Sequence, residues 1–313
     1  MPDVLCLGIF VADVIARPVD SYPQRGQLIL VERMETHIGG CAANTAIDLA
    51  KLGFNVGAMG KVGCDGFGDF VLNTLQRHGV DTRGVVRDPE HATSGTMVLV
   101  HSDGERSFLH YLGANAALTD ADVDFNLVQQ AKLLHIAGHF LMPKFDGKPA
   151  ARVLQRAQAM GVTTTLDTAW DSRGNWMRLL RHCLPYIEYF VPSYEEAKMC
   201  AGRDNPRDVA QVFLDAGVKV VALKMGEQGC YLRTHDTEIR LPAYKVNTID
   251  ATGAGDAFAA GFLAGVLKGW DLELIGKFAN AVGALCTTAI GTTTGVRGLE
   301  ETMALVEKGM VNG

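Results

Sequence analysis

Residues 247–262 read NTIDATGAGDAFAAGF, a glycine-rich turn that leads directly into an apolar run favouring a helix. Backbone N–H groups in the first turn of a helix have no helical partner and lie at the positive end of its dipole, so they can bind an anion. Small residues such as Gly253 and Gly255 would let a phosphate approach that backbone closely. Asp256 falls in the expected first turn, where it could act either as a helix cap or as a base beside the anion.

The spacing of these glycines excludes two common nucleotide-binding patterns. A dinucleotide fingerprint requires G-x-G-x-x-G, but Phe258 stands where the third glycine would follow Gly253 and Gly255. A phosphate-binding Walker loop requires G-x-x-x-x-G-K-[ST], and the sequence contains no such string. The expected anion site therefore belongs to another class.

A second run of small residues, GGCAANTA at residues 39–46, also leads into a helical stretch, which ends at Gly53. Its backbone amides could reach a polar ligand, and Asn44 could both donate and accept hydrogen bonds. The alternative for this run is close helix packing with Asn44 as a cap.

Apolar strand-like runs alternate with helical stretches along most of the chain. The strand-like runs are residues 4–10, 56–62, 133–136, 163–166, 189–191 and 218–223. The helical stretches are residues 44–52, 69–78, 150–160, 194–200, 250–268 and 272–289. This alternation predicts βαβ units, and hence a three-layer, doubly wound α/β fold whose mostly parallel sheet has helices on both faces.

Two segments depart from that alternation and predict a small additional β-sheet. Residues 96–111 form a hairpin pattern around an Asp-Gly turn, and residues 28–31 (LILV) read as a short strand after Pro18, Pro23 and Gly26. We therefore expect a small sheet or lid at residues 13–37 and 91–112. The α/β domain would then comprise residues 1–12, 38–90 and 113–313.

Composition excludes several classes of partner. The 313 residues carry 29 Lys and Arg against 35 Asp and Glu, a net charge of −6 with no basic block, which argues against nucleic acid. No stretch reaches the roughly 18 apolar residues that a membrane span needs. The seven cysteines are scattered and contain no Cys-x-x-Cys pair, so a reducing, cytoplasmic setting is expected.

Taken together, these segments resemble the ribokinase-like (PfkB) carbohydrate kinases, in the order of that family and over nearly the whole chain. The run DATGAGD at residues 250–256 resembles the C-terminal signature, and GANAALT at residues 113–119 resembles the stretch after the lid strands. The N-terminal signature is matched by Gly39, Gly40, Asn44, Gly53 and Gly63. The resemblance implies an ATP-dependent phosphotransferase that phosphorylates a hydroxyl of a small ribose-, fructose- or keto-sugar-acid-like carbohydrate.

The resemblance also implies a role for individual residues. Asp256 would take the proton of the sugar hydroxyl, with an anion hole made by the amides of Gly253, Ala254, Gly255 and Asp256. The sugar would be bound by Asp13, Gly39, Gly40 and Asn44. The nucleotide would be bound by Lys224, Gly226, Gly229, Asn280 and Ser193. Glu196 would act on Mg²⁺ indirectly, and a monovalent cation such as K⁺ would be held by Asp250, Thr252, Cys286, Ala289, Gly291 and Gly295.

Two departures from the family pattern leave the substrate open. Ser193 replaces the Asn of the family's Asn-x-x-Glu motif, which we expect to retune the metal dependence. Gly138 stands near the position of the acidic sugar contact of ribokinases, which weakens ribose as the substrate. The alternatives are a nucleoside kinase, with Phe108 or Tyr111 against the base, and a non-enzymatic sugar or nucleotide sensor. The apolar lid also favours a homodimer, with no membrane or nucleic-acid partner.

Overall fold

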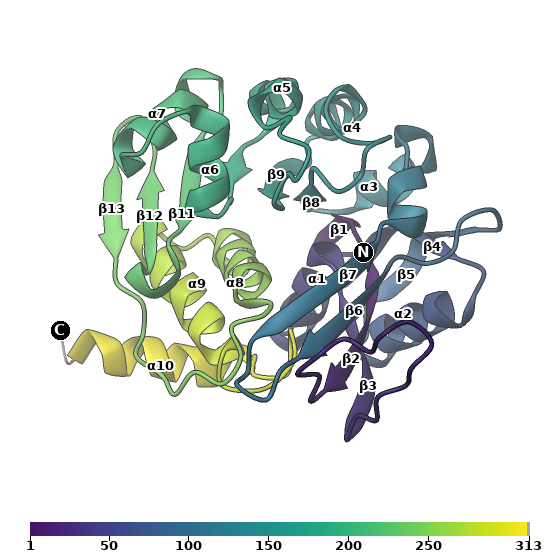
Figure 1. Ribbon diagram of the computed structural model, residues 1–313. Coiled ribbons are helices and arrows are strands. Elements are labelled where there is room, and N and C mark those ends of the chain that lie inside the picture. Colours follow the sequence, from purple (N-terminus) through teal and green to yellow (C-terminus); the bar gives the residue numbers. More distant parts are fainter. Residues whose placement is uncertain (312–313) are drawn as a thin grey trace.

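The computed structural model describes residues 1–311, which form a large and a small β-sheet (Figure 1). The large sheet has the order β13-β12-β11-β10-β9-β8-β1-β4-β5. Its strands are β1 (Val4–Gly8), β4 (Val56–Gly63), β5 (Asp81–Asp88), β8 (Leu133–His139), β9 (Thr163–Thr168), β10 (Tyr189–Phe190), β11 (Val220–Lys224), β12 (Cys230–Arg233) and β13 (Glu238–Leu241). Neighbouring strands from β5 to β11 are parallel, whereas β12 and β13 are antiparallel.

Helices cover both faces of this sheet, each over its own apolar core (Figure 1). One face carries α1 (Cys41–Lys51), α2 (Gly66–Arg77), α8 (Ala254–Lys268), α9 (Leu272–Cys286) and α10 (Leu299–Val311). The other carries α3 (Phe125–Gln130), α4 (Lys148–Ala159), α5 (Met177–Leu180), α6 (Tyr194–Ala201) and α7 (Pro206–Asp215). The predicted three-layer α/β fold is therefore confirmed. Between residues 1 and 311, every helix is too short or too polar to cross a bilayer.

The strand order reverses at β1, which pairs with β4 on one side and with β8 on the other. In open α/β sheets, ligands bind at such a reversal, beyond the carboxyl ends of the strands. The topology therefore directs attention to the loops that follow β1, β8, β9 and β11.

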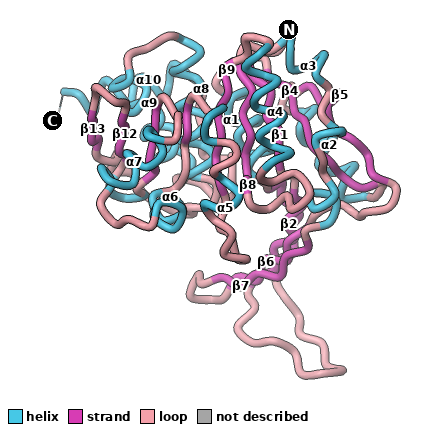
Figure 2. Tube along the Cα trace, turned by 90° about the horizontal axis from the view of Figure 1, so that it is seen from above, coloured by secondary structure: helices cyan, strands magenta, loops and turns pink. Residues whose placement is uncertain are grey.

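The small sheet has the order β3-β2-β6-β7 and projects from the body of the molecule (Figure 2). Its strands are β2 (Val11–Arg17), β3 (Arg33–Gly39), β6 (Gly95–Val100) and β7 (Arg106–Tyr111). The predicted hairpin is β6 and β7. The strand predicted at residues 28–31 was wrong, because that run lies in the loop before β3, where Leu28 and Leu30 are 79% and 89% exposed. No strand pairs with this run, and of its residues Val31 packs against the small cluster of Ala16, Val19 and Leu99.

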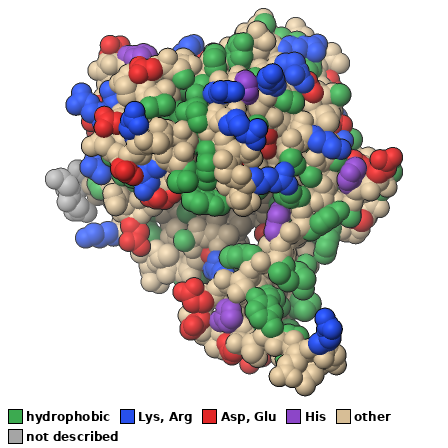
Figure 3. Space-filling view, turned by 45° about the horizontal axis from the view of Figure 1, so that its top comes forward, with side chains coloured by type: hydrophobic (Ala, Val, Ile, Leu, Met, Phe, Trp, Pro, Cys, Tyr) green, Lys and Arg blue, Asp and Glu red, His purple; other side chains and the backbone are tan. Residues whose placement is uncertain are grey.

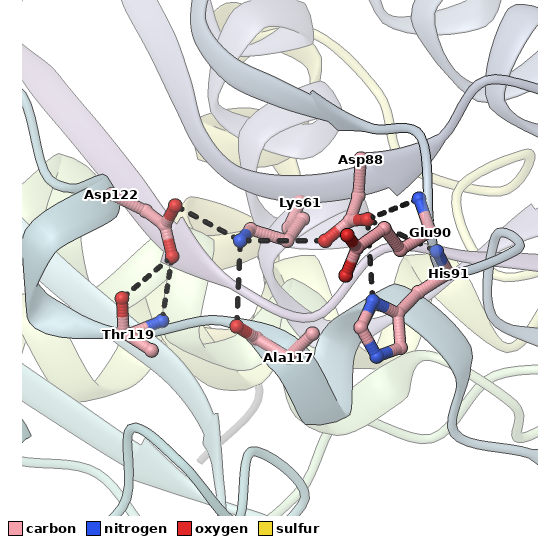
Figure 4. A network of polar contacts seen from close by, with 7 residues as sticks. All are labelled: Lys61, Asp88, Glu90, His91, Ala117, Thr119 and Asp122. Carbon is pink, nitrogen blue, oxygen red and sulfur yellow. Dashed lines mark hydrogen bonds and ion pairs between the residues drawn. The ribbon is translucent and has the colours of Figure 1, made fainter.

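Polar contacts fix the segments that connect the two sheets. Asn115, in the 3₁₀ turn η1 (Gly113–Ala117), exchanges two hydrogen bonds with the backbone of Phe10, between β1 and β2. In Figure 4, the Lys61 ammonium on β4 lies 2.9 Å from a carboxylate oxygen of Asp122 and 3.5 Å from one of Asp88. Because these carboxylates belong to the segments entering and leaving β6 and β7, one buried charge holds both connections to the large sheet.

Candidate active site

A cavity of about 540 Å³ lies at the carboxyl ends of β9 and β11, beside the start of α8. Figure 3 shows the surface hollowed between the body and the projecting small sheet. The residues predicted for catalysis, nucleotide and magnesium that line this cavity are Ala254, Gly255, Asp256, Lys224, Gly226, Gly229, Asn280, Ser193 and Glu196. Residues from four separate parts of the sequence thus meet at the edge that the topology singles out.

The glycine-rich turn adopts a backbone that only glycine tolerates well. Gly253, the N-cap of α8, has φ +84°, and a Cβ atom there would lie 2.3 Å from the Thr292 carbonyl oxygen. A Cβ atom at Gly255 would lie 3.5 Å from the Lys224 ammonium, so that cation sits beside the first turn. The amides of Gly255 and Asp256 have no helical acceptor there, whereas the Ala254 amide donates to the Ala251 carbonyl at 3.3 Å. A fixed positive charge and free helix amides therefore face the same space.

Asp256 is held by side chains and does not cap its helix. The amide Nδ2 of Asn44, on α1, donates to Asp256 Oδ2 at 2.7 Å. The Thr292 hydroxyl donates to Asn44 Oδ1 at 2.8 Å, which fixes the orientation of that amide. The cap alternatives are wrong for both residues, because Gly253 and Gly40 occupy the N-cap positions and no side chain caps either helix. Burial raises the pKa of Asp256, although the Asn44 hydrogen bond and the Lys224 charge oppose that shift.

A buried ion pair forms the floor of the cavity. Lys224 Nζ donates to Asp167 Oδ2 at 2.6 Å, and the two side chains are 11% and 2% exposed. Burial acts against the charge on Lys224, but Asp167, Glu196 and Asp256 outweigh it and raise the pKa of the ammonium. Asp167 was missed in the sequence, where its only signal is its place at the end of a predicted strand, in the run TTTLDT.

Ser193 and Glu196 make a local motif at the start of α6. The Ser193 hydroxyl accepts from the Glu196 amide at 3.3 Å, and Glu196 Oε2 accepts from the Ser193 amide at 3.3 Å, a capping box. Thr168, at the end of β9, donates its hydroxyl to the same Oε2 at 2.8 Å. The serine that departs from the family pattern therefore preserves the helix start and the position of Glu196.

The remaining predicted nucleotide residues shape the far wall of the cavity. Asn280 donates to the Pro242 carbonyl at 3.0 Å. Gly229 has φ +86°, and a Cβ atom there would lie 2.0 Å from the Leu241 carbonyl oxygen. Trp170 also lines the cavity, 55% exposed, and packs edge-on against Trp176 with ring centroids 5.1 Å apart. This wall offers apolar surface to a flat group.

A row of polar residues crosses the small sheet. The strand register pairs Asp13 with His37 and with Thr96, and Thr96 with His110. The Thr96 hydroxyl lies 3.1 Å from His110 Nδ1. A Cβ atom at Gly39 would lie 2.2 Å from Asp13 Oδ2, so the glycine lets this carboxylate approach the start of α1. The next residue, Gly40, has φ +93°, and a Cβ atom there would lie 2.4 Å from the Ile9 carbonyl oxygen.

The sequence did not single out His37 or His110, because their proximity to Asp13 arises only from strand register. Side chains alternate along a strand, so Phe108 lies on the same face of β7 as His110, and Tyr111 lies on the opposite face. Phe108 stands beside Val98, and Val98 beside Ile15, in the next row on that face. An apolar row thus adjoins the polar one.

The residues predicted for a monovalent cation gather around the loop before α8. Asp250 accepts from the Thr252 amide at 2.9 Å and from the Gly291 amide at 3.2 Å. The Cys286 thiol donates to the Thr292 carbonyl at 3.1 Å, and a Cβ at Gly295 would lie 2.5 Å from the Cys286 carbonyl oxygen. Ala289 lies in the turn that leads from α9 to Gly291. One partner of Asp250 was missed entirely: Arg106 Nη2, from β7, lies 2.9 Å from its Oδ1.

Comparison with known proteins identifies the family. The model of the pfkB family carbohydrate kinases matches residues 1–297. The ribokinase of Staphylococcus aureus (strain COL) is 30% identical over 292 residues, 90% of this chain and 93% of its own length. Fructokinase-2 of Zea mays is 31% identical over 270 residues, 81% and 80% of the two chains.

Solved structures agree with this match. An Escherichia coli protein crystallised with ATP and Mg²⁺ superposes with a TM-score of 0.84 at 25% identity, over 98% of this chain and 100% of its own. The shared fold includes the small separate sheet. The chain belongs to the pfkB family of carbohydrate kinases, which are phosphotransferases with a hydroxyl acceptor.

Proposed function

We propose that this kinase transfers the γ-phosphoryl group of ATP to a hydroxyl of a small, uncharged sugar, with Asp256 as the general base. The observation that carries the proposal is the chain of contacts through Asp256. That carboxylate lines the cavity with Lys224 and the first turn of α8, and it is bonded to Asn44 on the side of α1. A cavity of about 540 Å³ is of the size that binds small ligands such as nucleotides.

Phosphoryl transfer depends mainly on positioning and on stabilising charge. The Lys224 ammonium and the amides of Gly255 and Asp256 would face the negative charge of the transferred group, and one such donor is worth about 3 kcal/mol. Asp256 would accept the hydroxyl proton at a carboxylate oxygen, which contributes roughly 10²–10⁴-fold. Asn44 would keep that carboxylate ionised and aimed, because its amide is itself held by Thr292.

The acidic groups on the cavity wall fit a magnesium ion bound through water. Glu196 and Asp167 line the cavity beside Lys224, and hard oxygen ligands are those that Mg²⁺ prefers. When bound, Mg²⁺ neutralises charge on the phosphates. The chain's own contribution is the capping box, which holds Glu196 in place through Ser193.

The polar row supports an uncharged substrate. Asp13 is a carboxylate that can accept hydrogen bonds from hydroxyls, and His37 lies between it and Glu35, 3.4 Å from the Glu35 carboxylate. Two arginines on this face are paired, Arg33 with Glu35 and Arg106 with Asp250, and a third, Arg17 on β2, stands opposite Arg33 and acts on the Glu35 carboxylate. A carboxylate or phosphate on the substrate would have to compete with Glu35 and Asp250 for these arginines, beside the Asp13 carboxylate. A neutral pentose or ketohexose is therefore favoured over a sugar acid.

A nucleoside kinase is the second candidate, and a specific observation favours it. Ile15, Val98 and Phe108 form an apolar row beside Asp13, on the face that Arg106 turns toward α8. A flat base could pack on this row while its ribose occupied the polar one.

A substrate screen separates these candidates. The protein with ATP and Mg²⁺ would be offered ribose, fructose, a keto-sugar acid and purine nucleosides, and ADP formation would give kcat/KM for each. A neutral sugar is expected to rank first. A nucleoside in first place, with a loss on Phe108→Ala, would select the second candidate. A sugar acid in first place would contradict the argument from the acidic lining.

The pH dependence of the reaction tests the role of Asn44. Asp256 must be ionised to accept a proton, so kcat/KM should fall as the pH falls through its pKa, which burial raises. Asn44→Ala removes a hydrogen bond that lowers this pKa. The acid limb of the pH profile, where kcat/KM falls with falling pH, should therefore move to higher pH. The exposed Asn73→Ala on α2 is the control, with an unchanged limb. A slower Asn44→Ala enzyme whose acid limb stays in place would refute the electrostatic role.

The outer face of the small sheet supports assembly with a second copy of the chain. Met34, Met97, Leu109 and Tyr111 lie on the face opposite Asp13 and are each at least 50% exposed. Pairing these faces would cover apolar surface that a monomer leaves in water. Sedimentation is expected to give a dimer for the wild type and a monomer for Met97→Lys with Leu109→Lys. A wild-type monomer at micromolar concentration would contradict this.

A further inference from the structure

Arg106 joins the small sheet to the loop that precedes α8. It stands at the start of β7, and its guanidinium donates to Asp250 Oδ1 at 2.9 Å and to the Thr252 hydroxyl. The Asp250 side chain is only 7% exposed, whereas that of Arg106 is 31% exposed. A residue of the small sheet therefore neutralises a buried carboxylate of the large domain, across 144 positions of sequence.

Asp250 organises the turn that carries the proposed anion site. It accepts from the Thr252 amide and from the Gly291 amide, so it ties residues 250–252 to the segment after α9. Gly253 follows at once as the N-cap of α8. A charged carboxylate this deeply buried needs a positive partner, since losing one leaves an uncompensated charge. Whatever holds Asp250 thus also sets the position of the helix start beside Asp256.

The same carboxylate belongs to the set of residues predicted to hold a monovalent cation. Asp250 and Thr252 do lie together, but the cation that contacts both of them here is the Arg106 guanidinium. The Asp250 carboxylate and the Thr252 hydroxyl, two of the predicted ligands, are therefore partnered from within the chain, and a K⁺ ion cannot take the place beside them while Arg106 is bonded there.

We infer that Arg106 is a positioning residue for phosphoryl transfer, which supplies in place of a monovalent cation the positive charge that orders residues 250–256. Because it comes from β7, this order depends on the small sheet lying against α8. The inference rests on the proposed function for its effect on activity, because measuring kcat requires the sugar substrate. Hydrogen exchange of the 250–256 amides reports the ordering without any substrate.

The test compares Arg106→Ala with Arg83→Ala, an arginine on β5 outside the site, which pairs with Asp81 at 2.6 Å. In Arg106→Ala, the backbone amides of residues 250–256 should exchange hydrogen faster than in the wild type. The kcat should fall about 10²-fold, as expected when reacting groups are misplaced by about 1 Å. Millimolar guanidinium or K⁺, added to Arg106→Ala, should restore part of the exchange protection and part of the lost kcat. Arg83→Ala should match the wild type, and the wild type should gain nothing from K⁺.

Three results would overturn the inference. If the amides of residues 250–256 exchange hydrogen at the wild-type rate in Arg106→Ala, the contact between Arg106 and Asp250 is only a surface ion pair. Faster exchange that neither guanidinium nor K⁺ reverses would leave Arg106 with a packing role only. A several-fold activation of the wild type by K⁺ would show that an external cation is still needed. A wild type that phosphorylates no sugar or nucleoside would instead count against the proposed function, with the exchange result still valid.

Discussion

Asp256→Asn is expected to lower kcat by roughly 10²–10⁴-fold, the share that general-base catalysis usually supplies. The substitution keeps the size of the side chain and an oxygen that can accept the Asn44 hydrogen bond, but an amide cannot take up a proton at neutral pH. The dissociation constant for ATP should change little, because Lys224 and the helix amides are untouched. Steady-state kinetics and calorimetric titration with ATP measure the two quantities separately.

The matched control is Asp271→Asn, at the N-cap of α9. Asp271 accepts from the Leu274 amide, and asparagine caps a helix as well as aspartate does, so activity and stability should be retained. If Asp256→Asn keeps more than about a tenth of the wild-type kcat, the base assignment fails.

Gly253→Ala is expected to have the second largest effect, on both activity and stability. Alanine at φ +84° would suffer the left-handed backbone penalty of about 1–2 kcal/mol. It would also place its Cβ 2.3 Å from the Thr292 carbonyl, an overlap that only a backbone shift can relieve, at about 1–3 kcal/mol more. That shift would move the first turn of α8, and loss of one anion-hole donor costs about 10²–10³-fold in kcat.

The other end of the same helix supplies the control. Gly269, the C-cap of α8, has φ +68° and an open space around its Cβ position. Gly269→Ala should therefore pay the backbone penalty in the free energy of unfolding and leave kcat unchanged. Denaturant titration with kinetics at saturating ATP separates the two effects. Equal kcat values for the two variants would mean that the turn does not contribute to catalysis.

The spacing of apolar residues in the sequence predicted the helices and strands that are buried on one face or on both. The buried strand at residues 4–10 and the helical runs at 250–268 and 272–289 carry their pattern locally, and the structure forms them within a few residues. The edge strand β5 was not predicted, because its residues DTRGVVRD are mostly charged or polar and only partly buried. The wrong strand at residues 28–31 shows the reverse case, in which apolar residues lack any partner strand.

The candidate site divides in the same way. Gly253, Gly255, Asp256 and Asn44 carry a local signal, since helix starts need particular backbone and small residues. Asp167, His37, His110 and Arg106 have no such signal. They reach the site through strand register and through contacts that span more than fifty positions for Asp167 and 144 for Arg106. The roles of all these residues remain predictions that the variants above test.

The most direct test of the central claim is to identify the product when ATP and the best neutral sugar are incubated with the protein. Mass spectrometry and ³¹P NMR would follow the sugar and the phosphate together. We predict one sugar monophosphate for each ADP formed by the wild type, and no such product from Asp256→Asn. ADP and free phosphate beside an unmodified sugar would contradict the proposal that Asp256 activates a sugar hydroxyl.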